Sequence, residues 1–177
     1  MRAARRQPIR PSLVLRLEQP GAMLDHGFRG AAMEHAEREG AGHRTFEHTA
    51  DVGLEVWAPG LPELFEEAGQ GFVELMLDTG SVAPAQRRAV RAEGQEPEEL
   101  LVAWLEEILF AFDAEGFAPA GVSVLSMGAQ SVEGELKGEP FDRRRHRVLC
   151  NVKAVTYHDL AIKRTDDRCE VRIVFDV

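Results

Sequence analysis

Hydrophobic residues recur at helical spacing in two segments of the chain, residues 61–77 and residues 96–116. Pro62 and Pro97 suit the first turn of a helix, and Gly116 suits the position after the last turn. The pattern therefore predicts two amphipathic helices. Their apolar faces hold Leu64, Phe65, Ala68, Phe72, Leu75 and Met76 in the first and Leu101, Trp104, Leu105, Ile108, Leu109 and Phe112 in the second.

Most of the remaining segments are strand-like, with alternating or mainly apolar residues. Residues 43–58 predict one strand that ends before Pro59 and Gly60. Further strands are predicted over residues 89–93, 122–125, 131–137, 148–157, 160–164 and 169–175, with a hairpin turn at Thr165-Asp166-Asp167. Two helices among many strands indicate an α+β fold with mixed or antiparallel sheets. We expect a single compact domain over residues 43–177.

Composition narrows the class of protein. The 177 residues are 44% hydrophobic, which suits one domain with a real core, and a net charge of -9 argues against a broad nucleic-acid-binding surface. Cys150 and Cys169 are expected to be small buried hydrophobes in a reducing, cytoplasmic compartment. No apolar run approaches the roughly 20 residues that cross a membrane. The Arg- and Pro-rich residues 1–42 are expected to be a disordered extension or a misannotated start.

Side chains that could bind a ligand or act as an acid or base occur at three places: His48 with Asp51, the segment 151–160, and the chain end. A final strand that runs to the last residue would fix the carboxylate of Asp176 beside the α-carboxylate of Val177. Two fixed carboxylates repel each other and require a cation, hydrogen-bond donors or water. If Asp51 also lies there, the site has three hard oxygen ligands suited to Ca²⁺ or Mg²⁺. The alternative is that Asp176 is a solvated terminal acid.

Lys153 and His158 lie in the second of these segments. Lys153 either reaches water along its stem or neutralises a carboxylate cluster. His158 is either a residue at the rim of a site or a hydrogen-bonded structural residue. The chain lacks the CxxC and HxxxH spacings of zinc sites, a phosphate-binding glycine loop and a nucleophile elbow. These absences argue against an enzyme that acts alone.

Five motifs in order resemble the archease family: EHTADVGL, LLVAWLEEILF, GEPFD followed by His146, VKAVTYHDL, and the terminal VFDV. The resemblance covers roughly residues 43–177. It implies an accessory protein, not an enzyme, that activates an RtcB-type RNA ligase in tRNA splicing or RNA repair. Archeases promote guanylylation of the ligase histidine, a step that uses GTP and metal, and so allow multiple turnover. They also broaden the nucleotides that the ligase accepts.

The resemblance further implies that Asp51, Asp176 and Val177 hold the divalent metal. His48, Lys153 and His158 are expected at the rim of that site. Contact with RNA and GTP would be indirect, through the ligase, and no membrane would be involved. The basic patch of Arg143, Arg144, Arg145 and Arg147 is either a solvated loop or a contact for RNA or the ligase.

Two other functions remain open from the sequence. A chaperone-like binding module would use apolar strands and a sheet edge, without a metal. A hydrolase would use the carboxylates for metal-assisted attack by water, with His48 and His158 as the evident candidates for a general base.

Overall fold

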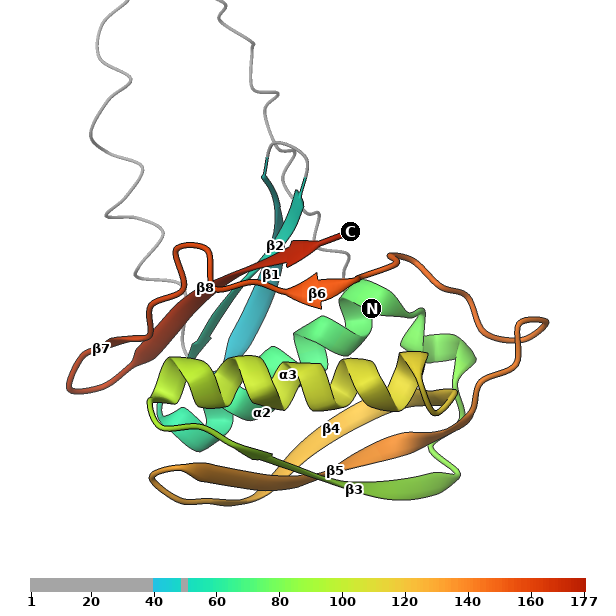
Figure 1. Cartoon of the computed structure of the whole chain (residues 1–177), viewed down its shortest axis with the longest axis horizontal. Helices are drawn as coiled ribbons and strands as arrows, with labels where there is room; N and C mark the ends of the chain where they lie inside the picture. Colours follow the sequence, from blue (N-terminus) through green and yellow to red (C-terminus); the bar gives the residue numbers. More distant parts are fainter. Residues whose placement is uncertain (1–39, 49–50) are drawn as a thin grey trace, which may run out of the picture. The chain divides into compact units, whose positions relative to one another are not determined.

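The computed structural model describes residues 40–48 and 51–177, and for residues 47, 48 and 51 it describes the backbone alone. The extension predicted at the N-terminus therefore lies almost entirely outside the described residues. No helix in the described part of the chain combines the length and apolarity needed to cross a membrane. The described elements form three layers, with a pair of helices between two sheets (Figure 1).

The two helices occur where the sequence predicts them. Helix α2 spans Leu61–Met76 and helix α3 spans Pro97–Asp113, each with a proline in its first turn. The first turns of both helices contain acidic residues, whose negative charge stabilises the positive end of the helix dipole. After α3 the chain turns at Gly116, whose positive φ of 66° is a conformation that favours glycine. A short 3₁₀ helix, η1, follows α2 at Thr79–Ser81.

The first sheet contains the beginning and the end of the described chain. Its strands are β1 (Gly42–His48), β2 (Asp51–Ala58), β6 (Ala154–Val155), β7 (Lys163–Arg164) and β8 (Cys169–Asp176). All pairings among them are antiparallel, in the order β1-β2-β8-β6, and β7 also pairs with β8. Strand β8, although last in the sequence, is therefore an interior strand of the sheet.

The second sheet has the order β3-β5-β4 and is also antiparallel. It is formed by β3 (Gln86–Glu93), β4 (Phe117–Met127) and β5 (Ser131–Pro140). Helix α2 packs against β4 of this sheet and β2 of the other, so it contributes to the core on both sides.

Close helix–strand contacts explain the glycines of α2. A side chain at Gly69 would lie 2.8 Å from Val122, and one at Gly71 would lie 2.7 Å from the ring of His43. Trp104 of α3 is fully buried and donates a 3.1 Å hydrogen bond to the carbonyl of Phe65. Gly69 and Gly71 therefore lie where α2 packs closely against strands of the two sheets.

Three predicted strands differ in the structure, and of the one over residues 160–164 only Lys163–Arg164 forms a strand. Residues 43–58 form two strands, β1 and β2, which pair back on each other from Gly42 with Trp57 to His48 with Asp51. The reversal was hidden because no glycine or proline marks the turn. In the predicted strand over residues 148–157, only Ala154–Val155 forms a strand. The first residues of this segment instead lie against the end of α2, where the amides of Leu149 and Cys150 donate to the carbonyl of Met76.

The predicted α+β class, with two main helices and antiparallel sheets in one domain, is confirmed. The predicted turn at Thr165 also forms, with its amide donating to the carbonyl of Arg168. Cys150 and Cys169 are free thiols, partly buried and buried respectively, and burial raises the pKa of each. Cys169 is thus buried as expected, whereas Cys150 is only half-buried and packs against the edge of the core.

Candidate metal centre

The end of the chain is held in place from several sides. Strand β8 lies between β2 and β6, and Phe175 is fully buried with its ring stacked on Phe72 of α2 at 4.8 Å. The amide and hydroxyl of Thr156 both donate to the carbonyl of Val174, at 3.1 and 2.8 Å. These contacts fix the backbone of the last strand up to its final residues.

The register of β2 on β8 determines which residues meet at this edge. Val52 is the partner of Phe175, and Gly53 is the partner of Val174. The next residue along β2 is Asp51, and the next along β8 is Asp176. The pairing of β2 with β8 ends at Val52 and Phe175, so Asp51 and Asp176 lie directly beyond its last pair, at the same end of the sheet.

Lys153 lies on the other side of Asp176. Its amide donates to the carbonyl of Asp176 at 2.8 Å, and its Nζ donates to the main-chain oxygen of Val177 at 2.8 Å. Asp176 itself is exposed, while Val177 is half-buried. The lysine thus places a positive charge beside Asp176 and Val177.

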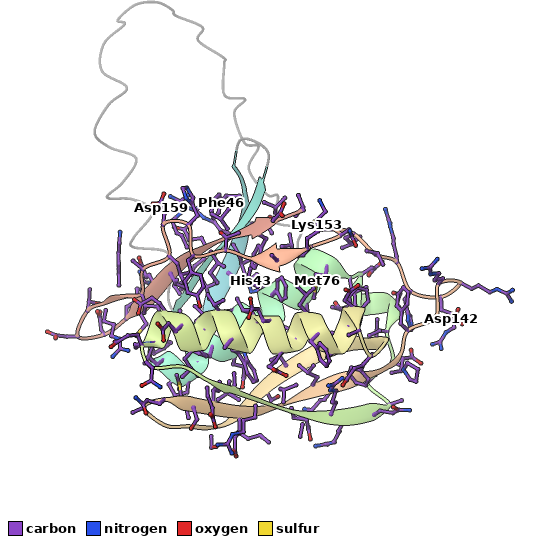
Figure 2. The ribbon with its side chains drawn as sticks, in the orientation of Figure 1. His43, Phe46, Met76, Asp142, Lys153 and Asp159 are labelled. Carbon is purple, nitrogen blue, oxygen red and sulfur yellow. The ribbon has the colours of Figure 1, made fainter. Side chains whose placement is uncertain are left out.

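His48 and His158 lie at different places relative to this edge. The backbone of His48 is the partner of Asp51 in the β1–β2 pairing, so it is one strand further out. His158 follows β6 and continues away from the chain end, with its exposed ring 3.4 Å from Asp159. Figure 2 shows Asp159 and Lys153 well apart on this sheet. Asp51 and Asp176 therefore lie next to the last β2–β8 pair, and Lys153 contacts Asp176 and Val177.

The donor set at this edge suits a hard cation. Carboxylate oxygens are the ligands that Ca²⁺ and Mg²⁺ prefer. Within the residues whose side chains are described, no group of three or more His, Cys, Asp or Glu could hold a metal ion. The further ligand that was predicted, Asp51, lies outside the residues whose side chains are described.

Sequence reasoning missed a second polar cluster, around Glu139 of β5. The Glu139 carboxylate accepts hydrogen bonds from the Ala83 amide at 2.8 Å, from Arg145 at 2.9 and 3.0 Å, and from His146 at 3.1 Å. The Ala83 amide and Arg145 are the main causes that lower the pKa of Glu139 to about 2. The motif GEPFD followed by His146 contains Glu139, but its spacing alone does not show which of its acids bonds to the His146 side chain.

The chain was compared with known families and proteins. The model of the Archease protein family matches residues 43–177. The chain belongs to the archease family. An archease from Methanopyrus kandleri is 37% identical over 134 residues, covering 74% of this chain and 96% of that protein. One from Sulfurisphaera tokodaii is 35% identical over 134 residues, covering 75% and 96%.

Solved structures agree with the fold of this archease. A solution structure of Methanobacterium thermoautotrophicum protein 1598 has 29% identity and a TM-score of 0.64, covering 77% of this chain and 99% of that one. A Thermotoga maritima crystal structure, titled as an archease and possible chaperone, has 22% identity and a TM-score of 0.56. It covers 76% of this chain and 96% of that one, and at this identity it supports the fold alone.

Proposed function

We propose that this archease activates an RtcB-type RNA ligase by promoting guanylylation of the ligase histidine. It would thereby sustain multiple turnover in tRNA splicing or RNA repair, as an accessory protein and not an enzyme. Family membership supports this proposal, and the observation that carries it is the fixed chain end. The main-chain oxygen of Val177 is held by Lys153, and Asp176 lies one register step beyond the Val52–Phe175 pair.

The proposed ligands of the divalent metal are Asp51, Asp176 and the carboxylate of Val177. When bound, the ion would offset negative charge that builds on the leaving pyrophosphate as a histidine attacks GTP. The chain's own contribution is to hold the carboxylates at one exposed edge, where a partner can approach. Lys153 would limit the net negative charge of that edge and keep Val177 in position.

A guanylylation assay with the ligase from the same source tests the proposal. The intact chain is expected to accelerate formation of the ligase–guanylate adduct in the presence of Mg²⁺. Asp176→Asn and Asp51→Asn are expected to abolish that acceleration, and so is one residue added after Val177. Asp166→Asn is the matched control, since Asp166 is an exposed acid in the turn before β8. Full stimulation by folded Asp176→Asn would reject the metal role.

A chaperone-like role is the alternative, and exposed apolar side chains favour it. Val148, Leu149 and Tyr157 are 42%, 51% and 60% exposed. A general chaperone would tolerate Asp176→Asn and an added C-terminal residue. Suppression of the aggregation of an unrelated unfolded protein, unaffected by either change, would support this alternative over the ligase role.

A further inference from the structure

A groove of about 400 Å³ opens where α3 ends and the chain leaves β5. The rings of Phe112 and Phe141 form part of its wall and meet edge to face with their centroids 5.3 Å apart. Val148 lines the groove and is 42% exposed, so its apolar surface is open to solvent. Arg143 and Asn151 supply polar groups beside these apolar walls.

The loop that borders the groove is a built turn. The Asp142 carboxylate accepts the Arg144 amide at 2.9 Å, and the Asp142 carbonyl accepts the amides of Arg145 and His146. His146 is buried, and its Nδ1 accepts the Asp142 amide at 3.0 Å while its Nε2 donates to Glu139. Figure 2 shows Asp142 on this loop. Hydrogen bonds of Asp142 and of the buried His146 therefore hold the turn in place.

Three arginine side chains on or next to this turn are exposed to solvent. Arg145 is paired with Glu139, whereas Arg143, Arg144 and Arg147 are exposed. Across residues 40–48 and 51–177 the structure records no ion pair for these three. They form a local concentration of positive charge on a chain whose net charge is -9. Exposed arginines on an ordered turn beside a groove with aromatic walls are typical of a protein interface, where arginine and aromatic residues are enriched.

We propose that this groove and the arginines beside it bind an acidic segment of a partner protein, with an apolar side chain of that segment packed against Phe112, Phe141 and Val148 in the groove. Guanidinium forks match carboxylates in two-point hydrogen bonds. The groove has room for one or two side chains of the size of leucine or phenylalanine. Asn151 is available to bond the backbone of the segment.

Charge favours a protein segment over RNA as the occupant. Three arginines are few for a polyanion, and the Asp113 carboxylate in the groove repels any anion, so an acidic segment would place its carboxylates at the arginines and its apolar side chain in the groove. The overall charge of -9 repels a long nucleic acid, whose binding depends on clustered cations. A short acidic segment needs only the local arginines and gains from the apolar contact as well.

The groove is connected to the chain end. The segment from Val148 to Lys153 runs between them, with Asn151 in the groove and Lys153 at Val177. One partner can therefore cover both surfaces. That this partner is the RNA ligase rests on the proposed function, whereas the acidic and apolar chemistry of the occupant does not.

Binding to defined probes tests the inference. The full chain is titrated into a short labelled peptide of Asp and Glu that carries a Leu-Phe pair, and separately into a single-stranded RNA oligonucleotide. The Arg143→Glu/Arg147→Glu variant is expected to weaken peptide binding by about tenfold or more. Lys163→Glu/Arg164→Glu makes the same charge change on exposed residues of β7 and is expected to bind like the intact chain. Val148→Ser is expected to weaken binding without altering charge.

Three results would overturn the inference. The first is equal peptide binding by the intact chain and the Arg143/Arg147 variant, and the second is no peptide binding by the intact chain. The third is preferential binding of RNA that the same variant abolishes, which would make RNA the occupant. Circular dichroism of each variant confirms folding, and Val148→Ser provides a second test because its side chain is largely exposed.

Ligase assays separate failure of this inference from failure of the proposed function. The Arg143→Glu/Arg147→Glu variant is expected to need a higher concentration for half-maximal stimulation and to reach the same maximum. Asp176→Asn is expected to lose the maximum. If the intact chain stimulates no ligase, the proposed function fails while the peptide titration still decides the inference.

Discussion

Lys153 and Val177 are joined at the edge of the first sheet, where Nζ of the lysine donates a 2.8 Å hydrogen bond to the main-chain oxygen of the last residue. The Lys153 backbone also pairs with Asp176. This lysine therefore sits beside two of the three groups that we propose as metal ligands. A cation bound there would share the oxygen of Val177 with the positively charged side chain of Lys153.

Replacing Lys153 with methionine is expected to increase the affinity of the chain for a divalent ion. The charge of Nζ repels a nearby cation, and two unit charges about 4 Å apart in water interact by about 1 kcal/mol in total. We expect a severalfold lower Kd for Ca²⁺, measured by calorimetric titration. Lys163→Met, on β7, is the control. A weaker affinity in Lys153→Met would mean that the lysine supports the site mainly by positioning Val177.

Gly71→Ala is expected to destabilise the protein although alanine favours helices. The gain in helix propensity is about 1 kcal/mol. A methyl group at Gly71 would approach the ring of His43 to 2.7 Å, and Glu67 holds that ring by a 2.6 Å contact. Overpacking costs about 1–3 kcal/mol, so the net change in unfolding free energy is a loss. Urea denaturation measures it.

Gly121→Ala is the matched control for Gly71→Ala. The nearest atoms to an added methyl group at Gly121 lie 4.0 Å away. The urea midpoint of this variant is expected to be equal to or above that of the intact chain. Stabilisation by Gly71→Ala would show that β1 and α2 are less tightly packed than described.

Trp104→Phe is expected to lower the unfolding free energy by about 2–3 kcal/mol, because it opens a cavity and removes a buried hydrogen bond. Trp104 is fully buried and donates to Phe65. Leu125 is 69% exposed, and Leu125→Ala is expected to change stability by less than about 0.5 kcal/mol. Denaturant titration compares the two, and equal effects would contradict the position of Trp104 in the core.

Glu139→Gln is expected to lower the melting temperature at neutral pH but not in strong acid. The pKa of Glu139 is lowered to about 2 in the folded state, from an ordinary value near 4.5. A lowered pKa means that the carboxylate stabilises the fold fully above pH ~4.5 and loses this effect as the pH falls toward about 2. Melting curves across this range test it. A constant difference between the two proteins would contradict the role of the charge.

The sequence predicted the helices well and the first sheet only in part. The spacing of Leu101, Trp104 and Ile108 indicates one buried helix face, which is what the structure has. The β1–β2 reversal was missed because strand-forming residues continue on both sides of it. Residues 148–153 were predicted as strand because alternation cannot distinguish pairing in a sheet from packing along the end of a helix.

At the candidate site, the sequence indicated a fixed chain end but not its neighbours. Alternation of Val171, Ile173 and Phe175 predicted a buried face, and all three are buried. Asp51 lies next to the last β2–β8 pair, Val52 with Phe175, and that pairing joins residues more than a hundred positions apart. Only the resemblance to archeases suggested Asp51, because long-range register is not encoded in local pattern. The Glu139 cluster was missed for the same reason.

Metal binding by the intact chain is the most direct test of the central claim, that Asp51, Asp176 and the end of Val177 jointly hold a divalent ion. Calorimetric titration with Ca²⁺, repeated with Mg²⁺, is expected to give one site. Asp51→Asn and Asp176→Asn should each remove that site, and an added C-terminal residue should weaken it, whereas Asp166→Asn should leave it intact. Equal binding by the intact chain and by folded Asp51→Asn and Asp176→Asn would contradict the claim.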